Sequence, residues 1–259
     1  MNRLAGLAAV LLAFTVVYAS DPKAVDFNRK GGAAFKRGDY KAALSYYEKA
    51  LRVNRSVEDF EGIATDLFNL AVVYRKLGER ENAIKSIDEV LGMPKAHGEM
   101  SGIRSGAAYL KAMVYLDSGD YGLSEEWAGK ALSFCRGDCP SEGRVFNLRA
   151  RLALKNGDPA TALTLGLKGL EANRKQGDPL EEANSLRIIA DAKLASGDYP
   201  GAVDHYESAL ALDKALGLSG KIALDLTGLG NAYEGQGMPD KAAGYFRRAR
   251  SVGEAAPSL

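Results

Sequence analysis

The chain has 259 residues, of which 46% are apolar and 26% charged, so its composition is that of a folded protein and excludes a disordered one. Lysine and arginine number 34 and aspartate and glutamate 33, a balance that argues against nucleic-acid binding, which needs an excess of positive charge. Two histidines and two cysteines leave few ligands for a metal and few general bases. We therefore expect no metal and no cofactor.

The first twenty residues have the pattern of a secretory signal. Arg3 precedes an uncharged apolar run that ends at Ala19, where small residues fit a cleavage site. The run is shorter than the roughly 20 residues that span a bilayer. We therefore expect residues 1–19 to be a signal peptide and the mature chain to be exported, to the bacterial periplasm, without a membrane span. An N-terminus that stays uncleaved and anchors the chain to the membrane is the alternative.

A pattern centred on a glycine recurs through the rest of the chain. The glycines follow one another at steps of 38 to 41 residues, at Gly38, Gly78, Gly119, Gly157, Gly197 and Gly237. Small residues stand seven positions before each of them, at Gly31, Ala71, Ala112, Ala150, Ala190 and Gly230. Small residues also stand five positions after each, at Ala43, Ala83, Ser124, Ala162, Ala202 and Ala242. Six similar units indicate a repeat protein.

Each unit has the features of a helical hairpin. Apolar and small residues recur at spacings of three, four and seven residues, which is the pattern of one face of an α-helix. The glycine ends the first helix, because a left-handed residue costs glycine little, and the aspartate that often follows can cap the second helix. The predicted hairpins span residues 24–57, 58–97, 98–138, 139–177, 178–217 and 218–257. A hairpin this small cannot bury its own apolar face, so neighbouring hairpins must stack.

The units resemble the tetratricopeptide repeat, most closely at Gly31–Leu51 and Leu229–Ala249. The resemblance implies an all-α fold, a right-handed α-solenoid of six TPR-like helical hairpins in one domain over residues 20–259. The units are longer than the usual 34 residues and are similar to the lengthened repeats of kinesin light chain and of Leu-Gly-Asn-type adaptors. We expect the extra residues to extend the first helix. Repeats three and four depart from the pattern at Ser124, Ala128, Gly166 and Gly169.

The same resemblance implies where a partner binds, because the first helices line the concave face of such a solenoid. The family's partner-facing positions lie ten and six residues before the turn glycine. The positions ten before are Asn28, Phe68, Tyr109, Asn147, Arg187 and Thr227, and those six before are Gly32, Val72, Met113, Arg151, Asp191 and Asn231. The predicted partner-binding residues are Asn28, Asn69, Tyr109, Met113, Arg144, Asn147, Arg151, Arg187, Asp191 and Asn231.

These residues form only a partial ladder of asparagines, a side chain that can donate to and accept from a peptide bond at once. Arg144, Asn147, Arg151 and Arg187 fall on neighbouring repeats, which favours an acidic or carboxylate-bearing segment as the partner. The competing interpretation is that these polar residues are the solvated face of amphipathic helices.

Cys135 and Cys139 flank Arg-Gly-Asp between repeats three and four. In an exported chain, two cysteines this close indicate a disulfide that closes a small loop. A redox-active pair is the alternative, although the spacing is not that of thioredoxin-like sites. The tripeptide at 136–138 also resembles an integrin-binding ligand, but glycine followed by aspartate is what this chain uses at turns.

Other single residues have a structural and a functional interpretation. His97 and His205 lack neighbours at metal-ligand spacing and are expected at the surface. Trp127 is expected to pack against the next repeat, and an exposed anchor for a partner is the alternative. Asn54 opens a glycosylation sequon.

Taken together, the residues favour a non-enzymatic scaffold for protein–protein interaction in the cell envelope, which binds a peptide or protein segment on its concave face. The alternative is a structural assembly factor for an envelope or secretion complex, acting through its convex or end surfaces. An enzyme is the third class, but no G-x-S-x-G, H-E-x-x-H or P-loop motif is present. The oligomeric state is left open.

Overall fold

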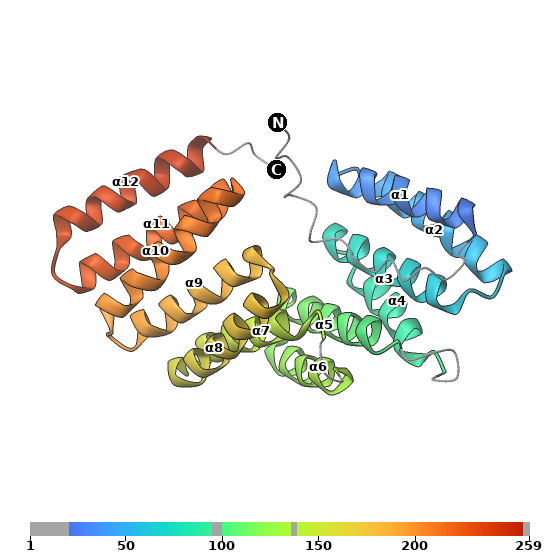
Figure 1. Cartoon of the computed structure of the whole chain (residues 1–259), viewed down its shortest axis with the longest axis horizontal. Helices are drawn as coiled ribbons and strands as arrows, with labels where there is room; N and C mark the ends of the chain where they lie inside the picture. The colour runs from blue at the N-terminus through green and yellow to red at the C-terminus, as the bar shows by residue number, and fades with distance from the viewer. Residues whose placement is uncertain (1–20, 95–99, 136–138, 256–259) are drawn as a thin grey trace. The chain divides into compact units, whose positions relative to one another are not determined.

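The computed structural model describes residues 21–94, 100–135 and 139–255, and within these ranges the chain is an all-α solenoid of paired helices (Figure 1). The helices are α1 (Pro22–Lys36), α2 (Tyr40–Ser56), α3 (Phe60–Leu77), α4 (Arg80–Gly92), α5 (Ser101–Asp117), α6 (Tyr121–Phe134), α7 (Glu142–Lys155), α8 (Pro159–Gln176), α9 (Pro179–Ala195), α10 (Tyr199–Leu216), α11 (Ser219–Gly235) and α12 (Pro239–Ala255). The expected signal peptide, His97 and the Arg-Gly-Asp tripeptide lie outside the described residues.

Local chemistry places the turn between the two helices of each hairpin. All six turn glycines have a positive φ, for example 76° at Gly78, which is the conformation that glycine adopts at least cost. After three of them an aspartate caps the second helix: Asp39, Asp158 and Asp198 each accept a backbone N–H from three residues on. The predicted hairpins are therefore confirmed at their turns.

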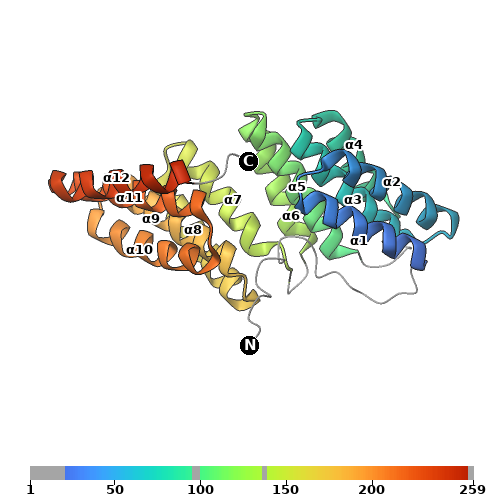
Figure 2. The ribbon, with the colours of Figure 1, turned by 90° about the horizontal axis from the view of Figure 1, so that it is seen from above.

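The two helices of each hairpin run side by side (Figures 1 and 2). The small residues seven before and five after each turn glycine are all buried, which lets the paired backbones approach. Large side chains fill the space that the missing side chains leave. A Cβ atom on Gly31 would lie 2.7 Å from the ring of Tyr47, and one on Gly230 would lie 2.4 Å from the ring of Phe246.

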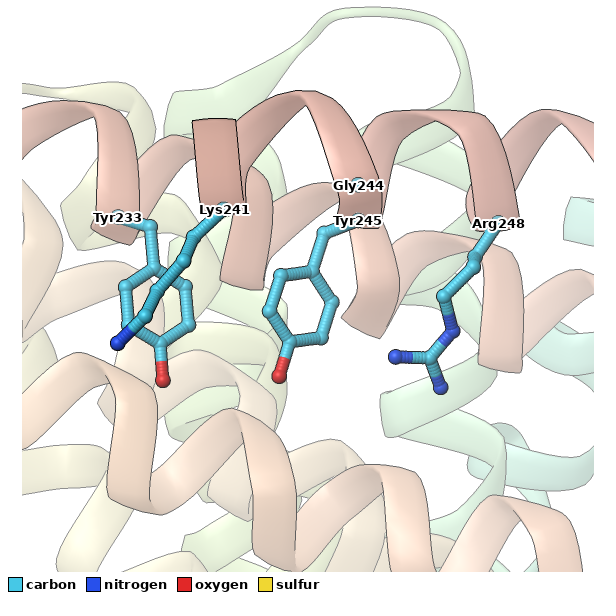
Figure 3. A pocket seen from close by; sticks show the side chains of 5 residues that line it. All are labelled: Tyr233, Lys241, Gly244, Tyr245 and Arg248. Atoms are coloured by element: carbon cyan, nitrogen blue, oxygen red, sulfur yellow. The ribbon is translucent and has the colours of Figure 1, made fainter. Parts of the chain in front are cut away.

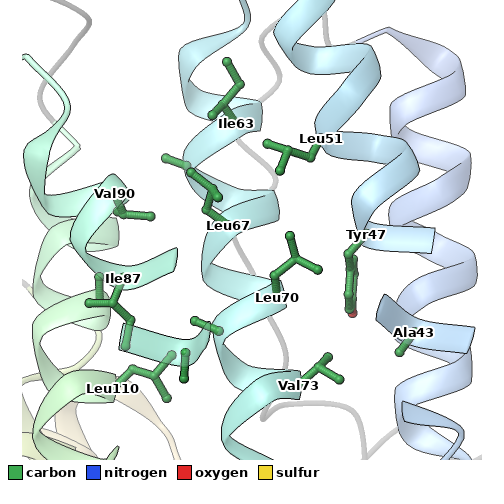
Figure 4. Packing of buried hydrophobic residues seen from close by; sticks show 14 of the residues in the cluster. Ala43, Tyr47, Leu51, Ile63, Leu67, Leu70, Val73, Ile87, Val90 and Leu110 are labelled. Atoms are coloured by element: carbon green, nitrogen blue, oxygen red, sulfur yellow. The ribbon is translucent and has the colours of Figure 1, made fainter. Parts of the chain in front are cut away.

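The chain divides into two compact units, one ending at Ser141 and one beginning at Glu142. In the first unit, apolar side chains of α2, α3, α4 and α5 form one continuous core, which includes Tyr47, Leu70, Ile87 and Leu110 (Figure 4). In the second unit the largest core cluster is centred on Tyr206 and Leu229. Neighbouring first helices also touch within each unit, α3 with α5, α7 with α9, and α9 with α11.

The lengthening of the repeats is not confined to the first helices, and this part of the prediction was wrong. α8 and α10 are second helices of 18 residues each, as long as the first helix α3. Each continues until a glycine of positive φ, Gly177 or Gly217, ends it. By contrast, α4 has only 13 residues, because Pro94 follows its end and disfavours further helix.

Cys135 and Cys139 are joined by a disulfide, with their Cα atoms 5.2 Å apart. The hydroxyl of Ser105 on α5 lies 3.1 Å from the sulfur of Cys135 and 3.2 Å from that of Cys139. The bridge therefore ties the end of α6 to the segment that precedes α7 and rests on α5. Among the described helices, none combines the length and the apolar character that crossing a membrane requires.

Candidate partner-binding surface

The polar residues ten before the turn glycine do not simply face solvent. At three junctions between repeats, the residue ten before the turn glycine belongs to a hydrogen-bonded set of three polar residues. The second member lies sixteen residues after the same glycine, on the second helix. The third lies twelve residues before the next turn glycine, on the first helix of the next repeat. We name these sets the Asp66 triad, the Asn147 triad and the Arg187 triad. They consist of Asn28, Asn54 and Asp66; of Asn147, Asn173 and Ser185; and of Arg187, Asp213 and Asp225.

The Asp66 triad joins the first repeat to the second. Asn28 on α1 and Asn54 on α2 each donate a side-chain amide to one carboxylate oxygen of Asp66 on α3, both at 2.6 Å. Asp66 is fully buried. Burial raises the pKa of Asp66 to about 7, while the two amide donors act in the opposite direction. Asn54 is also buried, so its amide is not accessible for glycosylation in the folded chain.

The Asn147 triad joins the fourth repeat to the fifth without any charge among its members. Ser185 on α9 donates its hydroxyl to Asn147 on α7 at 2.8 Å, and Asn173 on α8 donates to Ser185 at 3.0 Å. Two glycines make room for these amides. A Cβ on Gly143 would lie 2.0 Å from Asn173 Oδ1, and one on Gly169 would lie 2.5 Å from Asn147 Oδ1.

The Arg187 triad joins the fifth repeat to the sixth. Arg187 on α9 donates through Nε to Asp225 on α11 at 2.6 Å and through a terminal nitrogen to Asp213 on α10. Both carboxylates are fully buried, and only 9% of Arg187 is exposed. The guanidinium also donates to Asn184 at 3.0 Å. At the second junction the equivalent positions hold Phe68, Pro94 and Ala107, so that junction has no polar triad.

Other predicted partner residues are either buried or paired inside the chain. Asn69 is buried, and its side-chain oxygen has no hydrogen-bond partner within the described structure. Arg144 pairs with Asp178 at 2.8 Å, and Asp191 accepts a hydrogen bond from the hydroxyl of Tyr206. Tyr109 and Met113 on α5 are half-buried, whereas Arg151 on α7 and Asn231 on α11 are exposed. The partner-binding role of all ten residues stays a prediction.

Exposed and half-buried residues on the first helices of the second unit form a surface that we name the first-helix surface. It comprises Arg151 on α7, Asn184 on α9, and Lys221, Leu224 and Asn231 on α11. Lys221 donates to Asn184 at 2.9 Å. Burial lowers the pKa of Lys221, and the nearby positive charges of Arg187 and Arg151 contribute to the same shift, while Asp213 and Glu181 act in the opposite direction. Leu224 is 55% exposed. Within the described part of the chain, neither Arg151 nor Lys221 makes an ion pair with a carboxylate.

Three residues of this surface are not among the partner-binding residues predicted from the sequence. Asn184 and Leu224 lie thirteen residues before their turn glycines, and Lys221 lies sixteen before. A signal was available, because Leu224 is an apolar residue on the face of α11 that the helix period assigns to solvent.

A second feature lies between α11 and α12, a hollow of about 430 Å³ (Figure 3). The rings of Tyr233 and Tyr245 stack 5.3 Å apart, with Lys241 over the first ring and Arg248 over the second. Burial raises the pKa of Tyr233, and Tyr245 and the carboxylates of Glu207 and Asp204 on α10 add to the shift. The lining of the hollow therefore holds two cations, with the carboxylates of Glu207 and Asp204 close enough to act on Tyr233.

The remaining candidates, Trp127 and His205, have contacts inside the chain. Trp127 is half-buried, with the amines of Lys111 and Lys130 each 4.0 Å from its ring centre. His205 is half-buried as well, and its Nδ1 lies 2.7 Å from the carbonyl of Gly201. In the part of the chain that the structure describes, no three His, Cys, Asp or Glu residues gather as metal ligands would.

Sequence comparison agrees with this architecture. A sequence model of the tetratricopeptide repeat matches residues 26–96 and 180–255, and a second such model matches residues 105–138. The chain belongs to the tetratricopeptide repeat family. The matched ranges do not include residues 139–179, where the fourth repeat departs from the usual pattern at Gly166 and Gly169, yet α7 and α8 form a hairpin there.

Relatives of this tetratricopeptide repeat chain include the photosystem I assembly protein Ycf3 of Prochlorococcus marinus. In strain NATL2A the identity is 35% over 74 residues, which are 29% of this chain and 41% of that protein, so the match spans about two fifths of the relative's length. In strain MIT 9215 the identity is 30% over 131 residues, which are 46% of this chain and 73% of that protein.

Solved structures share the fold at low sequence identity. BtubC from P. vanneervenii has a TM-score of 0.62 at 18% identity, covering 93% of this chain and 95% of that one. The kinesin light chain repeats of Podosopora anserina have a TM-score of 0.56 at 19% identity, covering 74% of this chain and 96% of that one. These likenesses support the all-α solenoid fold.

Proposed function

We propose that this protein is a non-enzymatic scaffold that holds an acidic segment of a partner protein on the first-helix surface. One observation carries the proposal. Arg151 and Lys221 reach this surface without a carboxylate partner among the described residues, whereas Asp213 and Asp225 below them are fully buried. The nearby carboxylates of Glu181 and Asp191 are half-buried whereas Arg151 is exposed, so charge complementarity favours an acidic segment.

The surface has further properties of a peptide-binding site. Asn231 can donate to and accept from a peptide bond, and Asn184, whose oxygen already accepts from Arg187 and Lys221, can donate to one. The exposed side chain of Leu224 supplies an apolar contact on the same helix as Lys221. A few polar groups around an apolar contact are typical of sites that hold an extended chain in one orientation.

A pair of designed peptides tests the proposal. A fluorescein-labelled twelve-residue peptide of glutamate and alanine is titrated with the full chain, and fluorescence anisotropy is read at low and at physiological salt. A peptide with lysine in place of glutamate serves as the comparison. We expect binding of the acidic peptide only, and weaker binding at higher salt because the ion pairs would form at the protein surface, where salt screens them.

Matched variants locate the site. The double variant Arg151→Glu with Lys221→Glu should weaken binding of the acidic peptide at least tenfold, about 1.4 kcal/mol. The control, Lys168→Glu with Lys214→Glu, changes the net charge equally but on the exposed faces of second helices, and should leave binding nearly unchanged. No binding by the unmodified chain, or equal loss in both double variants, would contradict the proposal.

A second function, assembly factor for an envelope or secretion complex, is favoured by the similarity to an assembly protein. Ycf3 is named as one for photosystem I. On this alternative, partners would engage the convex or end surfaces, where the Tyr233–Tyr245 hollow lies on α11 and α12. Binding of the acidic peptide that survives Arg151→Glu with Lys221→Glu but is lost in Lys241→Glu with Arg248→Glu would favour this alternative.

We further propose that the chain acts in the cell envelope after export. The proposal rests on the signal-like sequence of residues 1–19, with an uncleaved membrane anchor as the alternative. Expression of the full chain in a bacterial host, followed by fractionation and N-terminal sequencing, tests it. An N-terminus at Ser20 in the periplasmic fraction is the expected result, and an intact Met1 in the cytoplasmic fraction would contradict it.

A further inference from the structure

The Arg187 triad contains more negative than positive charge. Asp213 and Asp225 are both fully buried, and one guanidinium lies between them. Asp213 Oδ1 and Asp225 Oδ2 are buried and make no hydrogen bond within the described structure. Two carboxylates that share one cation leave one uncompensated charge in a site closed to water, which is unfavourable.

We propose that Asp213 and Asp225 hold one proton between them, and that this proton fastens the α11–α12 hairpin to the α9–α10 hairpin. The proton comes from solvent, binds the outer oxygen of Asp225, and is donated to the carboxylate of Asp213. The triad is then neutral, and both outer oxygens have a partner. Release of the proton to solvent leaves two carboxylates facing each other across the junction and loosens the last repeat.

Charged and titratable groups on α7, α9, α10 and α11 lie near the triad. They are Arg151 on α7, Glu181 and Asp191 on α9, Tyr206 on α10 and Lys221 on α11. Asp191 accepts a hydrogen bond from the hydroxyl of Tyr206. Lys221 attracts Asp213 but donates its hydrogen bond to Asn184, so the outer oxygens of Asp213 and Asp225 stay without a donor. Burial raises the pKa of Asp225 to about 6, Arg187 acts in the opposite direction, and Asp213 adds to the rise.

The direction of the pH effect follows from this rise. In the unfolded chain an aspartate titrates near its ordinary value of 3.8. Between that value and about 6, the folded chain holds the proton and the unfolded chain does not, so acid stabilises the junction. The stabilisation is fully present below about pH 4 and is lost as the pH rises through about 6. The inference does not depend on what the protein binds.

Hydrogen exchange with mass spectrometry on the full chain tests the inference. Protection of the amides of α11 and α12 is measured at pH 5 and pH 8 and corrected for the intrinsic exchange rate. We expect protection about tenfold lower at pH 8, because the pKa of Asp225 lies between these values. The amides of α7 and α8, whose junction with α9 is the uncharged Asn147 triad, should change much less.

Two variants separate the shared proton from a general effect of pH. In Asp213→Asn and in Asp225→Asn, Arg187 keeps one carboxylate and the excess negative charge is gone. The difference in amide protection of α11 and α12 between pH 5 and pH 8 should therefore fall below about threefold. The matched control Asp204→Asn, at an exposed position on α10, should keep the tenfold change. A tenfold change that persists in both triad variants would overturn the inference, as would the absence of any change in the unmodified chain.

Discussion

Asn54 at the end of the second helix donates its side-chain amide to Asp66 of the next repeat, at 2.6 Å. Both residues are fully or almost fully buried, and no cation accompanies the carboxylate in the described part of the first unit. The carbonyl oxygens of Asn28 and Asn54 are buried without a partner. A protonated Asp66 could donate to one of them after an amide flip, which gives this junction a preference for the neutral acid.

The first prediction concerns the pH dependence of stability. Burial raises the pKa of Asp66 to about 7 from its ordinary 3.8, so acid stabilises the fold and the gain is lost as the pH rises through about 7. The variant Asp66→Asn should show a smaller loss of unfolding free energy between pH 5 and pH 8 than the unmodified chain, measured by urea denaturation. The exposed control Glu48→Gln should keep the full loss. An equal loss of unfolding free energy between pH 5 and pH 8 in Asp66→Asn and in the unmodified chain would contradict the prediction.

The second prediction concerns glycines in helix interiors. A Cβ on Gly228 would lie 2.3 Å from the ring of Tyr206, which is almost fully buried, so Gly228→Ala should destabilise by about 1–3 kcal/mol. Gly244 on α12 has open space around its Cβ position, so Gly244→Ala should stabilise by up to about 1 kcal/mol. Thermal unfolding of the two variants should therefore shift in opposite directions. A shift of the same sign in both would refute the packing argument.

The third prediction separates a structural arginine from an exposed one. Arg187→Met leaves Asp213 and Asp225 without their cation and should lower the unfolding free energy by about 3–5 kcal/mol. Arg151→Met, the same substitution at an exposed position, should change it by less than about 0.5 kcal/mol. Replacing both aspartates by asparagine in the Arg187→Met background should recover most of the loss. Similar costs for the two single variants would show that the Arg187 triad is not buried as described.

The fourth prediction concerns the disulfide. Cys135 and Cys139 are four residues apart, and closing so short a loop stabilises by about 2 kcal/mol in the chain-entropy account. Reduction, or serine at both positions, should lower the unfolding free energy by about that amount, as read by denaturation with and without a reductant. A stability that does not respond to the reductant in the unmodified chain would contradict this.

The architecture could be predicted from sequence because its signals are local. A turn glycine such as Gly78 and a capping aspartate such as Asp39 act within four residues of themselves, and the small residues repeat with them. The division of length between the helices was less accessible, because it depends on Gly177 and Gly217, which end the second helices and do not recur in every repeat.

The site was harder to predict, because a polar residue on a first helix can either face solvent or enter a junction between repeats. Arg187 and Arg151 look alike in sequence, but Arg187 enters a junction between repeats and donates to Asp213 on α10 and Asp225 on α11. The clue lies in pairs of polar residues that are far apart in sequence, and it is recognisable only once the stacking of the repeats is known. In sequence, Gly169 is a departure from the repeat pattern, yet in the structure it makes room for the side chain of Asn147.

Photo-crosslinking from the first-helix surface is the most direct test of the central claim, that a partner segment binds there. A photoreactive phenylalanine replaces Leu224 on α11 in one variant and Leu167 on α8, a second helix, in the other; the two side chains are 55% and 49% exposed. Each variant is irradiated with the acidic glutamate–alanine peptide. Crosslinking predominantly from position 224 is the predicted result, and equal or stronger crosslinking from position 167 would contradict it.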